Sequence, residues 1–196
     1  TVYDAAFTTP NWMKEAIIYQ IFPDRFFNGN PANDAAKATA RGAEPAALKQ
    51  WNDLPGIPSV NDTDAYFNND FFGGDLEGIR QKLDYLQSLG VTVLYLNPIF
   101  TAASNHKYDP GNYEQIDPMF GSEEEWNAFA AELQKHGMYL MLDGVFNHVG
   151  DDSIYFDRYG KYDNVGAYEY WARVYGIMNE KNAPLADAQR IAEEQF

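Results

Sequence analysis

The stretch VTVLYLNPIF, residues 91–100, decides the fold, because it is an almost continuous apolar run. Such a run is typical of a strand that is buried on both faces of a parallel sheet. Two similar runs, AIIYQIFP at 16–23 and MYLMLDGVFNH at 138–148, predict two further buried strands. The sequence therefore predicts three strands, and Pro23 ends the first of them.

The intervals between these strands carry the apolar spacing of helices. Residues 75–90 are expected to form one helix, with Asp75 as the N-cap and Gly90 at the end. Residues 122–137 are expected to form another, which begins with a Ser-x-x-Glu capping box. The alternation predicts a parallel α/β sheet with right-handed crossovers.

Two architectures fit this alternation, a doubly wound open sheet and an eight-stranded α/β barrel. The first normally carries a G-x-G-x-x-G phosphate loop after its first strand. Here Asp24, Arg25 and Phe26 stand at that place instead. After residue 148, two more helices are expected at 164–180, with Tyr168, Trp171, Val174, Tyr175 and Met178 on one side, and from Pro184 to the last residue.

Composition limits the classes of function. The 196 residues include 14 Lys and Arg against 29 Asp and Glu, a net charge of −15, which argues against a nucleic-acid or anionic-membrane partner. The absence of Cys excludes disulfides and thiol catalysis. No apolar run is long enough to span a membrane, and the first residues lack the layout of a signal peptide.

A group of oxygen-bearing side chains follows the first strand. In RFFNGNPAND, residues 25–34, these side chains are Asn28, Asn30, Asn33 and Asp34. Ca²⁺ takes about 6–8 oxygen ligands, including amide and carboxylate oxygens, although such residues also serve simply as turn formers. NDTDAYFNND, residues 61–70, lacks the glycine and final glutamate of an EF-hand and is interpreted as an Asx-rich loop.

Polar residues also lie at the predicted strand ends. Asn97 ends the second strand, and Asp143, Asn147 and His148 end the third. In an α/β barrel the carboxyl ends of strands face the active site, although a satisfied buried hydrogen bonder explains each residue equally well. The loop 101–113 leaves the same edge, and its His106, Lys107, Tyr108 and Asp109 can present a ring face and hydrogen bonders to a sugar.

Several segments together resemble the α-amylase family, glycoside hydrolase family thirteen. Residues 143–148, DGVFNH, resemble its D-x-V-x-N-H region at the end of the third barrel strand, and 18–26 and 72–76 resemble its first strand and G-G-D helix start. NHKYD at 105–109 is similar to a loop of the neopullulanase and amylopullulanase branch. Residues 150–175 resemble, less closely, an inserted domain of amylopullulanases.

The resemblance implies a partial (β/α)8 barrel containing strands one to three and helices one and two. Residues 1–147 are then the N-terminal part of the catalytic barrel, and 148–196 are the start of the inserted domain B. A complete barrel needs about 250 residues, so we expect the chain to be the N-terminal portion of a larger enzyme. Its partners are expected to be an α-glucan and the remainder of the catalytic domain.

The resemblance also implies a calcium site and a set of substrate contacts. Tyr108 is expected to stack on the glucose ring at the cleavage point, His148 to hydrogen-bond the hydroxymethyl group, and His106 to lie near the substrate. Asp143 and Asn147 are expected to act as scaffold. The implied Ca²⁺ ligands are Asn28, Asn30, Asn33, Asp34, Gly73 through its carbonyl, and Asp75.

The implied activity is retaining hydrolysis of α-1,4 or α-1,6 glucosidic bonds in starch or pullulan. The family's catalytic carboxylates follow strands four, five and seven, so no catalytic residue is expected in this chain and the chain alone is expected to be inactive. The parent is expected to be secreted, and a cytoplasmic location stays open. Two alternatives also remain, a non-catalytic α-glucan-binding or heteromeric protein and a transglycosylase.

Overall fold

The main sheet contains the three predicted strands. The computed structural model describes residue 4 and residues 6–34, 46–56 and 69–196. In it β1 (Ile18–Ile21), β4 (Val93–Leu96) and β7 (Tyr139–Leu142) are parallel and lie in the order β1-β4-β7. Strands that follow one another in this series are therefore neighbours in the sheet, as in an α/β barrel and in one half of a doubly wound sheet. The prediction of three barrel-type strands is confirmed.

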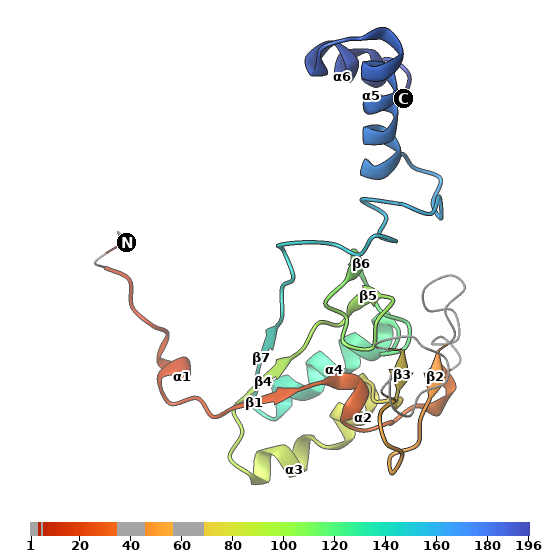
Figure 1. Ribbon diagram of the computed structural model, residues 1–196. Coiled ribbons are helices and arrows are strands. Elements are labelled where there is room, and N and C mark those ends of the chain that lie inside the picture. The colour runs from red at the N-terminus through yellow and green to blue at the C-terminus, as the bar shows by residue number, and fades with distance from the viewer. Residues whose placement is uncertain (1–3, 5, 35–45, 57–68) are drawn as a thin grey trace.

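The helices are α1 (Asn11–Lys14), η1 (Pro23–Arg25), α2 (Leu76–Gln81), α3 (Leu83–Ser88), α4 (Glu123–Lys135), α5 (Ala167–Lys181) and α6 (Leu185–Glu193). The short strands are β2 (Ala47–Leu48), β3 (Asp70–Phe71), β5 (Phe100–Ala102) and β6 (Pro110–Ile116). Figure 1 shows α2, α3 and α4 next to the main sheet, and α5 and α6 apart from it.

The helix predicted at 75–90 consists of two pieces. Lys82 separates α2 from α3, because its φ of −105° and ψ of 7° lie outside the α-helical region. The predicted start is confirmed, since the Asp75 side chain accepts a hydrogen bond from the Gly78 N–H. The capping box of α4 is also confirmed, with Ser122 and Glu125 bonding each other's backbone N–H groups.

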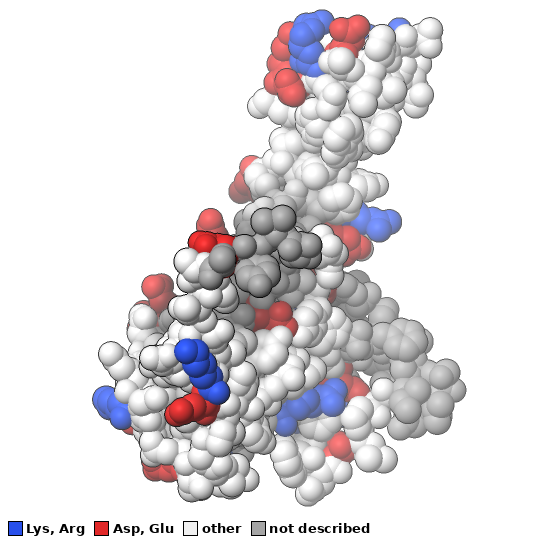
Figure 2. All heavy atoms as spheres, turned by 90° about the vertical axis from the view of Figure 1, so that its left-hand side faces the viewer, with Lys and Arg blue, Asp and Glu red and all other residues white. Residues whose placement is uncertain are grey.

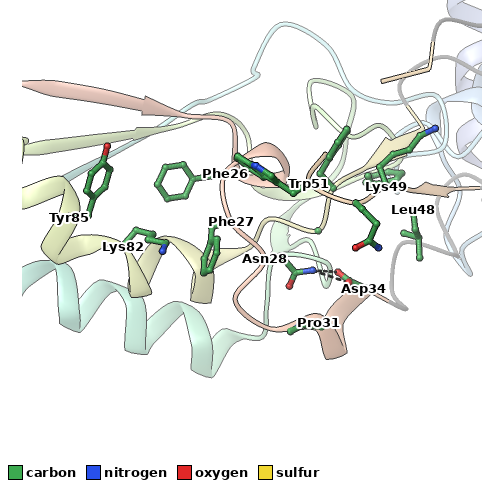
Figure 3. A pocket seen from close by; sticks show the side chains of 14 residues that line it. Phe26, Phe27, Asn28, Pro31, Asp34, Leu48, Lys49, Trp51, Lys82 and Tyr85 are labelled. Atoms are coloured by element: carbon green, nitrogen blue, oxygen red, sulfur yellow. Dashed lines mark hydrogen bonds between the residues drawn. The ribbon is translucent and has the colours of Figure 1, made fainter. Parts of the chain in front are cut away.

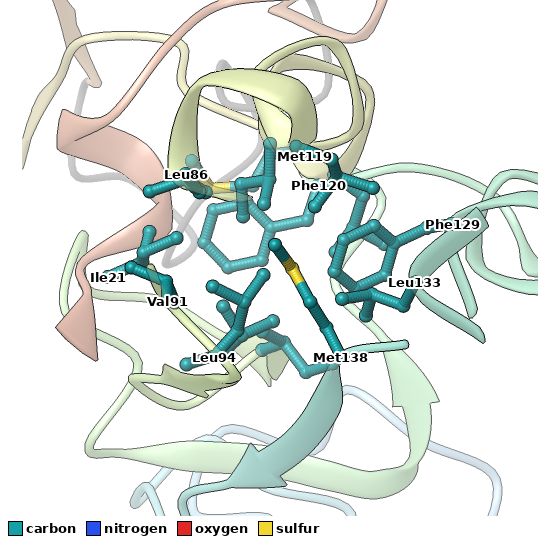
Figure 4. Close-up of a cluster of buried hydrophobic side chains, with 14 of the residues drawn as sticks. Ile21, Leu86, Val91, Leu94, Met119, Phe120, Phe129, Leu133 and Met138 are labelled. Atoms are coloured by element: carbon teal, nitrogen blue, oxygen red, sulfur yellow. The ribbon is translucent and has the colours of Figure 1, made fainter. Parts of the chain in front are cut away.

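The hydrophobic core lies between the sheet and the helices α2, α3 and α4 (Figure 4). Leu94 from β4 is fully buried beside Leu86 from α3 and Phe129 from α4. Phe120, which precedes α4, is also buried in this cluster. The apolar stripes of these helices therefore face the sheet, as their spacing in the sequence predicts.

Burial differs sharply between the central strand and the two outer strands. In β4, three of the four residues are buried. Ile18 in β1 and Tyr139 in β7 are instead 44% and 45% exposed, although the sequence predicts that both strands are buried. Each outer strand has one strand neighbour within the described residues. Along its other edge the backbone N–H and C=O groups have no partner strand there, and part of its apolar surface is exposed.

The segment after β4 contains more structure than the predicted loop. β5 and β6 form an antiparallel hairpin that encloses residues 103–109. Figure 1 shows β5 and β6 side by side, and the segment between them carries Tyr108. The predicted Asx-rich loop at 61–70 lies outside the described residues, except for Asn69 and Asp70.

The last two helices form a separate pair (Figure 1). Their shared apolar cluster contains Val174, Ile177, Ala188 and Ala192, and none of these belongs to the main core. Tyr175, expected on the apolar side of α5, is 57% exposed. The predicted domain boundary between residues 147 and 148 stays a prediction. Among the described helices, none is both long enough and apolar enough to cross a bilayer.

Candidate functional site

A cluster of polar side chains lies at the carboxyl ends of β4 and β7, and we call it the strand-end cluster (Tyr95, Tyr108, Asp143 and His148). Asp143 directly follows β7, Tyr95 lies within β4, and Tyr108 lies between β5 and β6. The Asp143 Oδ2 accepts hydrogen bonds from both phenols, at 2.9 Å from Tyr95 and 2.5 Å from Tyr108. One carboxylate therefore fixes two aromatic rings from different segments.

The same carboxylate controls the protonation of both phenols. The hydrogen bond to Asp143 raises the pKa of Tyr108 far above its usual value, and burial of the phenol adds to this effect. It also raises the pKa of Tyr95. Both phenols are therefore neutral donors at physiological pH, and the ring of Tyr108 is held in place by its own hydroxyl.

His148 supports the backbone of the same loop. Its Nε2 donates to the Tyr108 carbonyl at 2.7 Å, and its Nδ1 lies 3.3 Å from the Asn147 Nδ2. The hydroxyl of Tyr113 lies 3.0 Å from the His148 carbonyl. Both nitrogens of His148 are therefore engaged within the chain, next to the ring that the sequence predicts to be the sugar platform.

His106 also lies next to Tyr108, with their ring centroids 5.8 Å apart. Its Nδ1 accepts the Tyr108 N–H at 3.0 Å and lies 3.0 Å from the Ser104 Oγ. Because Nδ1 is the acceptor, the proton of the neutral ring is on Nε2. Ser104 also donates to the Asp109 carboxylate, so these residues order the loop around Tyr108.

Lys107 departs from its predicted role as a sugar contact. Its side chain is only 2% exposed, and its Nζ donates to the Ala102 carbonyl and to the Asp117 Oδ2, both at 2.7 Å. The prediction was wrong for this residue because its ammonium group is paired inside the chain, at a residue with a left-handed φ of 61°. Lys107 anchors the loop that carries Tyr108 through a buried ion pair.

The predicted calcium residues lie where the loop after β1 meets the G-G-D turn, and we call this region the asparagine-rich turn (residues 28–34 with 73–75). Asp75 is its hub. Its carboxylate accepts hydrogen bonds from the backbone N–H groups of Gly29 and Asn30, at 3.1 and 2.9 Å, and from the Asn33 Nδ2 at 3.1 Å, besides capping α2. The predicted ligands are thus brought together in one place.

Two oxygens of the asparagine-rich turn stand out because they lack partners. The Oδ1 atoms of Asn28 and Asn33 are buried and have no hydrogen-bond partner among the described residues. The Asn28 Nδ2 contacts both carboxylate oxygens of Asp34, at 3.2 and 2.9 Å. A Cβ added at Gly73 would lie 2.9 Å from the Asp34 Oδ1, so that glycine, with a φ of +84°, lies directly against the pair.

The donor chemistry of this turn suits a hard cation. Amide, carboxylate and carbonyl oxygens are the ligands that Ca²⁺ prefers. Within the described ranges no three His, Cys, Asp or Glu side chains gather into a metal-binding group, so amide oxygens have to carry part of any such site. Asn30 contributes less directly, since its side chain bonds the Ala32 N–H and the Glu125 carboxylate.

Sequence reasoning missed two residues of these sites. Tyr95 is one, although a phenol within an apolar strand is a signal, since a buried hydroxyl needs a partner. Asp24 is the other, and it is fully buried while its carboxylate accepts the N–H groups of Phe72 and Gly73. Its place directly after a strand and Pro23 gave no signal of its partner 48 residues away.

Charged side chains are scattered over the face that Figure 2 shows. Among the described residues on that face, Lys and Arg stand singly or beside Asp and Glu. A neutral polar ligand suits such a surface better than a polyanion.

Comparison with protein families matches residues 20–194 to "Alpha amylase, catalytic domain". The chain is 54% identical over 177 residues to an amylopullulanase from Thermoanaerobacterium saccharolyticum, which covers 87% of this chain and 14% of that protein. It is 42% identical to neopullulanase 2 from Thermoactinomyces vulgaris, over 97% of this chain and 28% of that protein. The chain thus spans 14% and 28% of the length of these two curated relatives.

Solved structures also match this chain. The type III pullulan hydrolase from Thermococcus kodakarensis matches with a TM-score of 0.67 and 40% identity, over 82% of this chain and 28% of that chain. A cyclic α-maltosyl-(1→6)-maltose hydrolase from Arthrobacter globiformis, in complex with that sugar, matches with a TM-score of 0.66 and 36% identity, over 84% and 33%.

Proposed function

Because the chain belongs to the alpha-amylase family and corresponds to the N-terminal part of its catalytic domain, we propose that its parent is a retaining α-glucan hydrolase of the amylopullulanase or neopullulanase type. Its substrates are starch, pullulan or their fragments, cleaved at α-1,4 or α-1,6 bonds. The single observation that supports this proposal best is the fixed ring of Tyr108 at the strand ends.

In the proposed reaction, this chain binds and orients the sugar. The face of Tyr108 stacks on the glucose ring at the cleavage point, and Asp143 keeps that ring at one angle. His148 holds the backbone of Tyr108, and its ring edge borders the hydroxymethyl group of the sugar. His106, which orders the backbone at Tyr108, lies near the substrate in this proposal.

The bond-breaking carboxylates belong to the remainder of the catalytic domain. A retaining mechanism needs a nucleophile and an acid/base about 5–5.5 Å apart. Asp143 accepts two phenol hydrogen bonds at the same oxygen, and this suits a scaffold better than a nucleophile. The chain alone is therefore inactive under this proposal, and it needs strands four to eight to complete both the barrel and the chemistry.

We further propose that the asparagine-rich turn binds Ca²⁺. The two unpartnered oxygens of Asn28 and Asn33 support this proposal, because a buried amide oxygen without a partner costs about 1–3 kcal/mol. When bound, the ion supplies electrostatic cross-linking between the loop after β1 and the start of α2. The proposed ligand set consists of Asn28, Asn33, Asp34 and the Gly73 carbonyl, with Asn30 and Asp75 ordering the turn around them.

Reducing-sugar release from pullulan and soluble starch tests the proposed function. The full-length parent is expected to release reducing sugar, and the 196-residue chain is expected to release none. In the parent, Tyr108→Ala is expected to lower kcat/KM about 100-fold, whereas Tyr175→Ala on the exposed face of α5 changes it little. Turnover by the chain alone would contradict the assignment of the carboxylates, and a parent that binds starch without cleaving it would favour a non-catalytic glucan-binding protein.

A further inference from the structure

An open pocket of about 810 Å³ is lined in part by the asparagine-rich turn, through Asn28, Pro31, Asp34 and Gly73, and lies apart from the strand-end cluster. Its walls come from three places, the loop after β1, the region around β2 and β3, and the junction of α2 and α3. Figure 3 shows Phe26 and Trp51 along its upper side, Pro31 below them, and Tyr85 and Leu48 at opposite ends. No member of the strand-end cluster lines it.

Exposed aromatic rings form the rim of this pocket. Trp51 is 71% exposed and Tyr85 is 55% exposed, although both are large rings next to an apolar floor that contains the buried Phe71. Trp and Tyr combine a flat apolar face with a hydrogen-bonding edge. Such rings bind ligands that present both an apolar face and hydroxyl groups, as a pyranose ring does.

The charged side chains at the pocket are equal in number, with Lys49 and Lys82 against Asp34 and the Asp70 that pairs with Lys49. The Lys49 Nζ lies 3.3 Å from the Asp70 carboxylate, and the Lys82 Nζ lies 4.1 Å from the centre of the Phe27 ring. Asp34 contacts the Asn28 amide. In the metal-free chain the pocket therefore offers donors and acceptors without a net excess of either charge, and this matches a neutral polyhydroxylated ligand rather than a phosphate or a nucleotide.

The pocket is close to the loop that carries Tyr108. Phe71 lines the pocket, and the Lys107 Nζ lies 5.5 Å from the centre of the Phe71 ring. The Asn105 Nδ2 also donates to the Asp70 carbonyl at 2.9 Å. Where one glucan chain occupies both places, binding at the pocket raises the local concentration of substrate at the strand ends.

We propose that this pocket is a second saccharide-binding site that holds a segment of the α-glucan chain, with Trp51 and Tyr85 as its stacking platforms. This proposal rests on the proposed function for the identity of the sugar. It does not depend on the location of the catalytic carboxylates, because the site uses only residues of this chain.

Calorimetric titration of the 196-residue chain with maltoheptaose tests the proposal. Trp51→Ala is expected to weaken binding about tenfold, and Tyr85→Ala about threefold, since each removes one stacking surface. Trp12→Ala is the matched control, because Trp12 is 39% exposed on α1 and stacks on Tyr139 away from the pocket. Tyr108→Ala is expected to leave the component that depends on Trp51 intact.

The melting temperature of each variant reports whether it folds like the unaltered chain, and Trp51 and Tyr85 are exposed enough for the substitutions to leave no cavity. Unchanged affinity in folded Trp51→Ala and Tyr85→Ala would overturn the pocket proposal. If Tyr108→Ala then abolished binding, the proposed function would stand without the second site. Absence of any maltoheptaose binding would also overturn the pocket proposal, and hydrolysis by the parent would still decide the proposed function separately.

Discussion

The strand-end cluster and the asparagine-rich turn both gather polar side chains next to the ends of parallel strands, but they differ in whether the polar atoms have hydrogen-bond partners within the chain. In the strand-end cluster, the Asp143 carboxylate and the two phenols satisfy one another, and both nitrogens of His148 have contacts within the chain. In the asparagine-rich turn, two buried amide oxygens have no partner among the described residues. The difference teaches that the strand-end cluster is held in one arrangement by its own hydrogen bonds, whereas the two unpartnered oxygens of the turn are what the calcium proposal explains.

Lys107 tests how firmly the strand-end cluster is anchored, and its substitution is expected to have the largest effect. Lys107→Met leaves the Asp117 carboxylate buried without its cation, so we expect a loss of about 3–5 kcal/mol of unfolding free energy in urea titrations. The double variant Lys107→Met with Asp117→Asn is expected to recover part of that loss. Equal stability of Lys107→Met and the unaltered chain would show that the loop does not depend on this ion pair.

Removal of Ca²⁺ tests the asparagine-rich turn. Chelation is expected to lower the melting temperature, and added Ca²⁺ at about one hundred times its Kd is expected to restore about 2.7 kcal/mol of stability. Asp34→Ala is expected to abolish this response, whereas Asp163→Ala, at an exposed position in the loop before α5, keeps it. A melting temperature that changes neither with chelator nor with added Ca²⁺ would count against the calcium site.

Asp143→Asn tests the hydrogen bonds within the strand-end cluster. Without the carboxylate, the pKa of Tyr108 is expected to fall toward its usual value, as followed by ultraviolet titration of the phenols. The lost charge-assisted bonds are expected to cost about 1.5 kcal/mol of stability. Tyr95→Phe removes only one donor and is expected to cost about 1 kcal/mol. An unchanged titration of Tyr108 in Asp143→Asn would mean that another group controls its protonation.

His136 provides the smallest expected effect, away from both regions. Its ring contacts the Glu132 carbonyl and the Asp84 carboxylate, each at 2.9 Å, and these contacts raise the pKa of His136 above its usual 6.5. Its stabilising contribution is therefore present below about pH 6.5 and is lost as the pH rises through the folded-state pKa. His136→Ala is expected to flatten that part of the stability profile in thermal melts, and an identical profile would contradict the assignment.

The sequence predicts the local features of this molecule well. The three strands, the capping box of Ser122 and Glu125, and the Asp75 cap follow from residue patterns within a few positions, and the structure contains all of them. The alpha-amylase family is confirmed over residues 20–194. Location, the domain boundary and the role of each site residue stay predictions or proposals.

What the sequence could not predict depends on distant partners. The exposure of Ile18 and Tyr139 follows from the number of neighbouring strands, which an apolar run does not reveal. The buried ion pair of Lys107 depends on a left-handed backbone conformation at that residue. The two bonds to Asp143 come from segments 48 and 35 residues away. Each of these outcomes is decided by tertiary packing.

Calorimetric titration of the metal-free chain with Ca²⁺ tests the contrast between the two regions most directly. We expect one Ca²⁺ per chain, and we expect the double variant Asn28→Ala with Asn33→Ala to lose that binding while Tyr108→Ala keeps it. Absence of binding by the folded chain, or binding that survives in the double variant, would contradict the account, because the unpartnered oxygens would then have no ligand to explain them.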